Sequence, residues 1–482
     1  MQSMESTLEG DVVTLEAPSV LEPEVLVEAT APAPEPPTGP ERSVLSFLES
    51  AAIKAAAWTV VSYGAAMGLR VVNSLVLVRL LAPEAFGEMA LVSTLIVGIT
   101  LLSDLGLGPS IIQSEHGDDV RFLNTAWTLQ AARGIALWLI AMAIAAPAAH
   151  WYHDPHLTKL LAVVALSCII NGFNSTGLLT LSRHMGVRRL FAIDFSTQIV
   201  GLAITVAWAW RWPSVWALVG GSLISSAYRL VLSHMQSVTP GVRNRWALDR
   251  KSLKDIVHFG KWIVLGTAFY FFASQADRLL LGRMVSLTTL GIYGIAFQIS
   301  DVPRSIINAF SQRVGFPFVA KLMQLPQSDF RSRFLRYRGY ALSAGAVMLS
   351  AMVVWGDLLI LKFYPARYHE GSWMIPVLAV GLWHTLLYTT TQPVLFSLGK
   401  STYNAVGNAL YCAAMLIGIP LGFKFFGLPG AVVAVAAGDF PLYVVTQFGA
   451  QREGVRPLRQ DMLLTLLFLA LLAVGFGLRR FA

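Results

Sequence analysis

Long apolar runs recur along most of the chain, separated by short polar segments. A helix needs roughly 20 apolar residues to cross the hydrocarbon core of a bilayer, because every backbone N–H and C=O must be satisfied within the segment. Twelve runs meet this length and predict spans near 57–80, 89–112, 125–147, 157–181, 190–210, 213–235, 259–282, 289–312, 339–361, 373–397, 402–423 and 427–448. A shorter run near 461–478 either crosses as a thirteenth span or lies in the interface.

Composition supports a polytopic membrane protein. Hydrophobic residues make up 55% of the chain and charged residues 13%, whereas about a quarter of the residues in a soluble domain are charged. The first 42 residues differ, because Met1 to Glu41 hold nine acidic residues, seven prolines and no Lys or Arg. Such a segment cannot bury enough apolar surface to fold, so we expect a disordered acidic, proline-rich cytoplasmic tail over 1–42.

The remaining residues are strongly basic, and their basic side chains gather in alternate loops. Residues 42–482 carry 36 Lys and Arg against 19 Asp and Glu, a net charge of +17 that suits anionic lipid or an anionic substrate. The loops after spans 4, 6, 8 and 12 hold most of the Lys and Arg found in loops. Loops rich in these residues stay cytoplasmic, so we expect a cytoplasmic N-terminus.

The chain also resembles itself after a shift of 204 residues. The shift aligns Trp58 with Trp262, Arg79 with Arg283 and Gly87 with Gly291. Because the offset is six spans, the repeats keep one orientation, which predicts two six-helix lobes around a central cavity, related by a pseudo-two-fold axis along the membrane normal. Chance similarity between two apolar hairpins is the alternative.

The predicted organisation follows from the tail, the spans and the basic loops. The N-terminal lobe covers 43–240, a basic inter-lobe loop 241–258, and the C-terminal lobe 259–450. A basic loop and an extra hydrophobic segment, counted as one or two further helices, cover 451–482.

Two charges and a proline interrupt span 8, in the sequence ISDVPRSI. A charge at bilayer depth costs at least about 2.5–3.5 kcal/mol, so such residues face a bundle interior or a water-filled cavity. Asp301 and Arg304 are three residues apart and share a helix face, while Pro303 removes a backbone donor and loosens the turn before it. We expect this face to line the cavity, and an ion pair that only locks two helices is the alternative.

Other ionisable residues inside predicted spans are candidates for the same cavity. Arg70 lies deep in span 1 and shares a face with Asn73. Asp277 and Arg278 are neighbours, so they point about 100° apart and should bind different partners. Asp439 lies in span 12, where it is protonated, pairs with an arginine from another span or binds a coupling ion.

Metal and cofactor motifs are not expected. His150, His153 and His156 are spaced like ligands on a helix, but Asp154 and Pro155 break that geometry. No nucleotide-binding motif is present, so energy would come from an ion gradient (proton or sodium), the membrane potential or consumption of the product.

Several segments together resemble bacterial polysaccharide flippases, which export lipopolysaccharide and exopolysaccharide precursors. These are VRLLAPEAFGEMALV (78–92), SDLGLGPSIIQ (103–113), LNTAW (123–127), DRLLLGRMVSLTTLGIYGIAFQISDVPRSI (277–306) and VGFPFVAKL (314–322). The family is related to multidrug and toxin extrusion transporters and to the peptidoglycan-precursor flippase. Asp277 and Arg278 match the family's Asp-Arg pair, and cationic residues on the first helix of the peptidoglycan-precursor flippase favour a cavity role for Arg70.

The resemblance implies a function, a location and partners. Alternating access of two lobes would move undecaprenyl-diphosphate-linked oligosaccharide across the bacterial inner membrane. Arg304 would bind the diphosphate, and Asp301 would hold Arg304 in place when no substrate is bound. Membrane lipids and a polysaccharide polymerase or export complex are the expected partners, and nucleic acid is not. We do not expect the protein to be an enzyme. A multidrug or cation exporter and a membrane polymerase or ligase are the alternatives.

Overall fold

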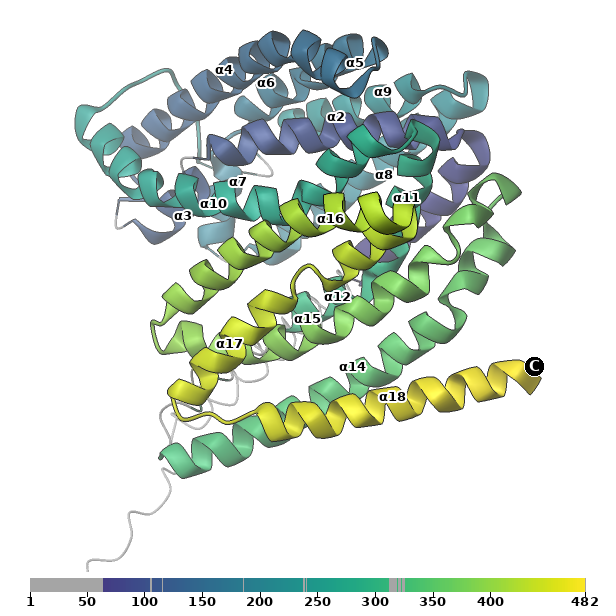
Figure 1. Cartoon of the computed structure of the whole chain (residues 1–482). Coiled ribbons are helices and arrows are strands. Elements are labelled where there is room, and N and C mark those ends of the chain that lie inside the picture. The colour runs from purple at the N-terminus through teal and green to yellow at the C-terminus, as the bar shows by residue number, and fades with distance from the viewer. Residues whose placement is uncertain are drawn as a thin grey trace, which may run out of the picture. The chain divides into compact units, whose positions relative to one another are not determined.

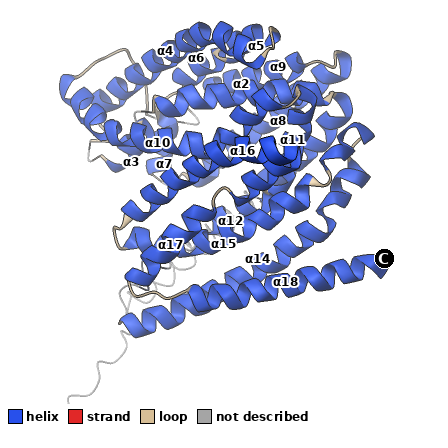
Figure 2. Ribbon diagram, viewed as in Figure 1, coloured by secondary structure: helices blue, strands red, loops and turns tan. Residues whose placement is uncertain are grey.

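The computed structural model describes residues 64–481, with gaps at 105, 115, 185, 237–238, 240, 312–318, 320–321 and 323–325. Contacts divide the chain into Met1–Trp58 and Thr59–Ala482, and the described residues all belong to the second unit. Across this part of the chain the structure consists of helices joined by loops, without strands (Figure 2). The expected tail over 1–42, Trp58 and most of the 314–322 motif lie outside the described residues.

The first half of the chain supplies the helices of spans 1 to 6. They are a helix over 64–80, α2 (Pro83–Leu102), α3 (Leu107–Gln113), α4 (Val120–Tyr152), α5 (His156–Val164), α6 (Leu166–Gly172), α7 (Gly177–Arg183), α8 (Val187–Arg211) and α9 (Val215–His234). The prediction of span 4 as one continuous helix is wrong, because the chain bends by 62° between Gly172 and Gly177. Gln130 of α4 satisfies the carbonyls that this break frees, donating its amide to Asn171, Gly172 and Asn174.

The second half supplies the remaining spans. They are α10 (Arg250–Met284), α11 (Leu287–Ser300), α12 (Val302–Phe310), α14 (Gln327–Phe363), the short 3₁₀ helix η2 (Ala366–Gly371), α15 (Met374–Ser397), α16 (Ser401–Ala437), α17 (Phe440–Arg452) and α18 (Leu458–Phe481). Helix breaks interrupt spans 8 and 12. Span 8 breaks at Asp301 and span 12 at Gly438 and Asp439, while Gly427, with φ +62°, forms the kink between spans 11 and 12.

The helix breaks reduce the number of helices that can cross the membrane without interruption. In the described residues, eight helices are long and apolar enough to cross a membrane, or nine if the bent pair from His156 to Arg183 is one span. Every predicted span still corresponds to a helix or to consecutive helices separated by a break. The all-α polytopic fold predicted from the sequence is therefore confirmed.

The two halves of the chain meet at α2 and α11 through residues that the 204-residue shift makes equivalent. Thr288 Oγ1 donates to Glu84 Oε1 at 2.6 Å. A Cβ on Gly87 would overlap the backbone of Leu287, and a Cβ on Gly291 would overlap the backbone of Pro83. The contact is reciprocal, as a two-fold axis requires, which favours a true repeat over chance similarity. The lobe boundaries themselves remain a prediction.

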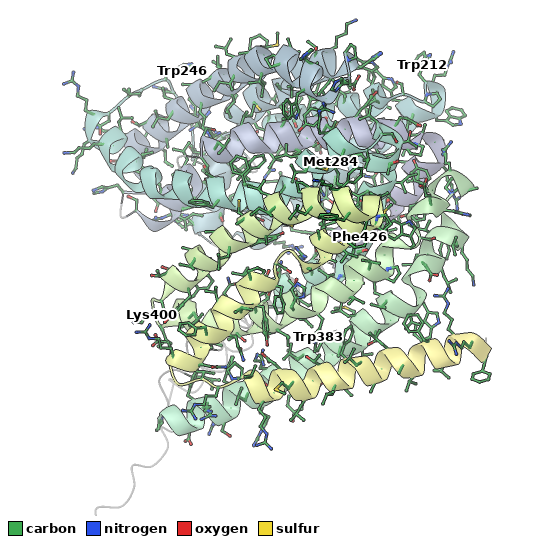
Figure 3. The ribbon with its side chains drawn as sticks, viewed as in Figure 1. Trp212, Trp246, Met284, Trp383, Lys400 and Phe426 are labelled. Atoms are coloured by element: carbon green, nitrogen blue, oxygen red, sulfur yellow. The ribbon has the colours of Figure 1, made fainter. Side chains whose placement is uncertain are left out.

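The helices run between two ends of the bundle, and the labelled side chains mark these ends. Trp246 and Lys400 lie at one end and Trp212 at the other (Figure 3). Trp246 belongs to the basic loop after span 6 and Lys400 to the loop after span 10, so two even-numbered loops share an end. This arrangement is the one that the alternation of loops predicts.

The C-terminal helix α18 lies alongside α14 (Figure 1). Arg338 near the start of α14 pairs with Asp461 near the start of α18, and Asp357 near the end of α14 pairs with Arg479 near the end of α18, each at 2.6 Å. Residue numbers rise together along the contact, so the helices are parallel. Since α14 is long enough to cross the bilayer, this packing favours the spanning alternative for the C-terminal segment over the interfacial one.

Candidate functional site

Charged side chains from distant parts of the sequence meet around Arg304. Arg304 Nε lies 3.2 Å from Asp301 Oδ1, and Arg304 Nη2 lies 3.8 Å from Asp439 Oδ2. Asp439 thus contacts an arginine from another span, which is one of the three possibilities left open by the sequence. We use the name Arg304 cluster for these three residues together with His384, Thr385, Tyr388 and Tyr411.

The helix breaks that position both aspartates have the same local cause. Asp301 precedes Val302 and Pro303, and Asp439 precedes Phe440 and Pro441. In each case the proline lies in the first turn of the next helix, where its missing N–H costs nothing. The Asp-x-Pro motif therefore ends one helix, starts another and leaves an acidic side chain at the junction.

The carboxylate of Asp439 is enclosed by side chains from α15. Its own side chain is only 4% exposed. Thr385 Oγ1 donates to Asp439 Oδ2 at 2.6 Å, the hydroxyl of Tyr388 donates to the same oxygen at 3.4 Å, and His384 Nε2 lies 2.5 Å from Oδ1. A carboxylate taken out of water needs such partners, and these anchor the break in span 12 against α15.

Exposure differs across the cluster in a way that bears on ligand binding. The Arg304 and Asp301 side chains are 27% and 30% exposed. Tyr411 of α16 also interacts with the Arg304 guanidinium. The cluster thus presents Arg304 and Asp301 at its open side and keeps Asp439 behind them. A guanidinium held in this way can exchange one carboxylate for a phosphate without leaving its site.

Asp277 and Arg278 bind different partners, as their angular separation suggested. The Tyr293 hydroxyl donates to Asp277 Oδ2 at 2.7 Å. Arg278 Nη1 donates to Gln275 Oε1 at 2.7 Å, and its guanidinium carbon lies 5.3 Å from the centre of the Phe297 ring. Both residues influence Asp301 electrostatically, so they lie beside the Arg304 cluster.

Arg70 and Asn73 belong to a different part of the structure. Both lie on the helix over 64–80, where Arg70 is exposed and Asn73 is half-buried. Asn73 Oδ1 is buried and has no hydrogen-bond partner among the described residues. Within the part of the chain that the structure describes, no hydrogen bond or ion pair joins either residue to the Arg304 cluster.

Sequence reasoning missed the polar residues of span 10. His384, Thr385 and Tyr388 lie in the segment WHTLLY (383–388), and an ionisable residue inside a span is a reason to expect a functional site. It also missed Arg133 of α4, which donates to the carbonyl of Thr100 and to Ser103 Oγ and lies 3.7 Å from Asp104. Arg133 caps the end of α2, so its role is structural.

The segment that holds His150, His153 and His156 is not one continuous helix, as Asp154 and Pro155 predicted. Helix α4 ends at Tyr152 and α5 begins at His156, with His153 at φ +57° between them. Nowhere in the described residues do three His, Cys, Asp or Glu side chains gather as metal ligands do.

Comparison with known proteins identifies relatives over most of the chain. Residues 76–371, more than half of the chain, match the family model described as polysaccharide biosynthesis protein. The lipopolysaccharide biosynthesis protein WzxC of Escherichia coli strain K12 is 22% identical over 381 residues, which cover 78% of this chain and 73% of WzxC. The teichuronic acid biosynthesis protein TuaB of Bacillus subtilis strain 168 is 21% identical over 305 residues, which cover 62% of each protein.

Solved structures share the fold. The lipid II flippase MurJ in an inward closed conformation superposes with a TM-score of 0.68 at 10% identity, covering 86% of this chain and 92% of MurJ. An inward-facing multidrug resistance MATE family transporter of the MOP superfamily gives 0.63 at 14% identity, covering 82% of this chain and 95% of the transporter. These likenesses confirm the predicted transporter-like fold.

Proposed function

Because the chain belongs to the polysaccharide biosynthesis protein family, we propose that it moves undecaprenyl-diphosphate-linked oligosaccharide from the inner to the outer leaflet of the bacterial inner membrane. The N-terminus faces the cytoplasm in this proposal, and a polymerase or export complex takes over the product. The names of the relatives and the MurJ-like fold support a flippase, and the family is one of transporters rather than enzymes.

The observation that carries the proposal is the partly exposed guanidinium of Arg304 inside the helix bundle. Arg304 is held by Asp301 on one side and by Asp439 on the other. Two oxygens of one phosphate can accept a bidentate pair of N–H bonds from a guanidinium, as a carboxylate can, and such charge-assisted hydrogen bonds are worth about 1.5–3 kcal/mol each. The substrate would therefore replace Asp301 at Arg304.

Further residues extend this site in the proposal. Arg278 would add a second positive charge beside Asp301, with Asp277 fixed by Tyr293 behind it. Arg70 and Asn73 would contact the substrate from the N-terminal lobe once the lobes move. Scattered polar and aromatic side chains would then read the sugar, and alternating access of the two lobes would complete transport.

A multidrug or cation exporter remains the second candidate because the MATE transporter shares the fold. A cation would need an acidic group that is free to receive it. Asp301 and Asp439 both contact Arg304 and Asp277 accepts from Tyr293, so a cation would have to displace these partners, whereas an anion competes directly for the Arg304 guanidinium.

The test is the distribution of lipid-linked oligosaccharide between leaflets in a host that lacks this protein. Wild type should restore the intermediate to the outer leaflet, whereas Arg304→Ala should slow its appearance there about 10- to 100-fold, the equivalent of one lost charge-assisted bond. Arg70→Ala should also be slower, and Arg333→Ala, at an exposed position on α14, should match wild type at equal expression. If the intermediate reaches the outer leaflet without the protein but stays unpolymerised, the flippase function is wrong and a polymerase or ligase function returns.

A further inference from the structure

His384 is a titratable side chain that contacts Asp439 and that the proposed phosphate contact at Arg304 does not use. His384 Nε2 and Asp439 Oδ1 are 2.5 Å apart, and the two side chains are 15% and 4% exposed. His384 Nε2 is buried and has no aligned hydrogen-bond partner among the described residues, so its contact with Asp439 Oδ1 is electrostatic. In a neutral imidazole that carries its hydrogen on Nε2, Nδ1 is free to accept a proton.

Charges around the pair are unbalanced by one. Helices α10, α11, α12, α15, α16 and α17 all contribute described groups that face this region. The charged and titratable ones are Asp277, Arg278, Tyr293, Asp301, Arg304, Tyr388, Tyr411 and Asp439. With the tyrosines neutral and the carboxylates ionised, three carboxylates oppose two guanidinium groups, so the described side chains lack one positive charge, which a proton on His384 would supply.

We propose that His384 and Asp439 form a proton-binding site that is coupled to anion binding at Arg304. This proposal rests on the proposed function, since it requires a diphosphate at Arg304. The Arg304–Asp439 contact, at 3.8 Å, is longer than the Arg304–Asp301 contact at 3.2 Å, and a diphosphate would draw the guanidinium further from Asp439.

Asp439 then keeps His384 as its nearest cationic partner. Nδ1 of His384 gains a proton from water, and the Nε2–H group of His384 continues to face the Asp439 carboxylate. No bond to the substrate forms or breaks. Because coupling between two binding events is reciprocal, a proton on His384 must in turn tighten anion binding. Anion affinity should therefore rise as pH falls.

The experiment uses the purified full chain in detergent, with geranyl diphosphate as the probe. Calorimetry near pH 7 in two buffers that differ in protonation enthalpy gives the number of protons taken up per bound probe. Wild type should take up about one proton more than His384→Gln, which keeps a polar side chain but cannot titrate in this range. Asp439→Asn should lose the extra proton as well, since it removes the charge that stabilises the imidazolium.

His116→Gln is the matched control, because His116 is exposed on the loop before α4 and should behave as wild type. Protons exchanged by the diphosphate itself are the same for every variant and cancel in the comparison. Binding with equal proton uptake in wild type and His384→Gln would overturn the proton site and leave the proposed function intact. No binding of the probe to folded wild type would overturn both.

Discussion

Glu84 and Thr288, which are 204 residues apart, hydrogen-bond to each other at the junction of α2 and α11. Nearby, the Arg367 guanidinium donates to the carbonyls of Val78, Arg79 and Leu81, at the end of the helix over 64–80. All these residues lie at span ends that the loop charges predict to be outer. The two halves of the chain are therefore closed against each other on that side, and we expect this closure to open and re-form in each transport cycle.

A disulfide across this contact should stop the cycle. Glu84→Cys with Thr288→Cys, in a background carrying Cys168→Ala and Cys412→Ala, should cross-link on oxidation, because the native side chains hydrogen-bond and the two backbones pack so closely that a Cβ on Gly87 would overlap Leu287. Transport should fall to the level of the deletion strain under oxidising conditions and recover with reductant. Each single cysteine variant should stay active in both conditions. Full activity of the cross-linked protein would show that this closure never opens.

The glycine pair at the same junction allows a second test within one helix. Gly291→Ala places a Cβ against the Pro83 carbonyl, and overpacking of this kind costs about 1–3 kcal/mol. Gly294→Ala, one turn further along α11, meets open space and should be neutral or slightly stabilising, because alanine favours a helix over glycine by about 0.5–1 kcal/mol. A comparison of Tm in detergent should show a drop for Gly291→Ala only. Equal values would mean that α2 and α11 do not pack this closely.

The sequence predicted the spans and the repeat because both depend on local pattern. Apolar runs determine where helices can cross the membrane. The 204-residue shift pairs Gly87 with Gly291, and in the structure each of these glycines packs against the backbone of the other segment. The helix breaks were not predicted, although the Asp-x-Pro motif occurs at both Asp301 and Asp439. In span 8 the proline suggested only a loosened turn, and in span 12 the apolar run hid the break.

The Arg304 cluster was predicted only in part, for a related reason. Asp301 and Arg304 are close in sequence, so helix geometry alone pairs them. The partnership of Arg304 with Asp439 and of Asp439 with His384 depends on how α12, α15 and α17 pack, which no spacing rule gives. Arg70 was grouped with these residues because it is also a deep charge, and the structure leaves it on a separate helix.

A buried ion pair outside the candidate site offers a test of stability. Arg338 and Asp461 are 1% and 2% exposed and 2.6 Å apart. Arg338→Met alone should destabilise the protein by about 3–5 kcal/mol, since it leaves Asp461 buried and unpaired. Adding Asp461→Leu should recover most of that loss, because an apolar pair of similar volume needs no desolvation. Thermal unfolding in detergent measures both, and a double variant no more stable than the single one would contradict the argument.

The parallel packing of α18 on α14 predicts where the C-terminus lies. Both helices should cross in the same direction, so a β-lactamase fused after Ala482 should protect cells from ampicillin, given the predicted cytoplasmic N-terminus. The same enzyme fused after Arg456, before α18, should not. Basic residues on the outer side oppose the usual charge bias, but the bidentate contact of Arg479 with Asp357, at 2.6 and 2.9 Å, neutralises one of them.

Because of its contact with Asp357, Arg479 should contribute more to the stability of the protein than Arg480 does. Arg479→Ala should cost about 1–2 kcal/mol, discounted because the Arg479 side chain is 34% exposed, and should weaken docking of α18. Arg480→Ala should leave Tm unchanged, since Arg480 is exposed. Protection by both fusions, or by neither, would show that α18 does not cross, and the Arg479–Asp357 pair would then have to form at the membrane surface.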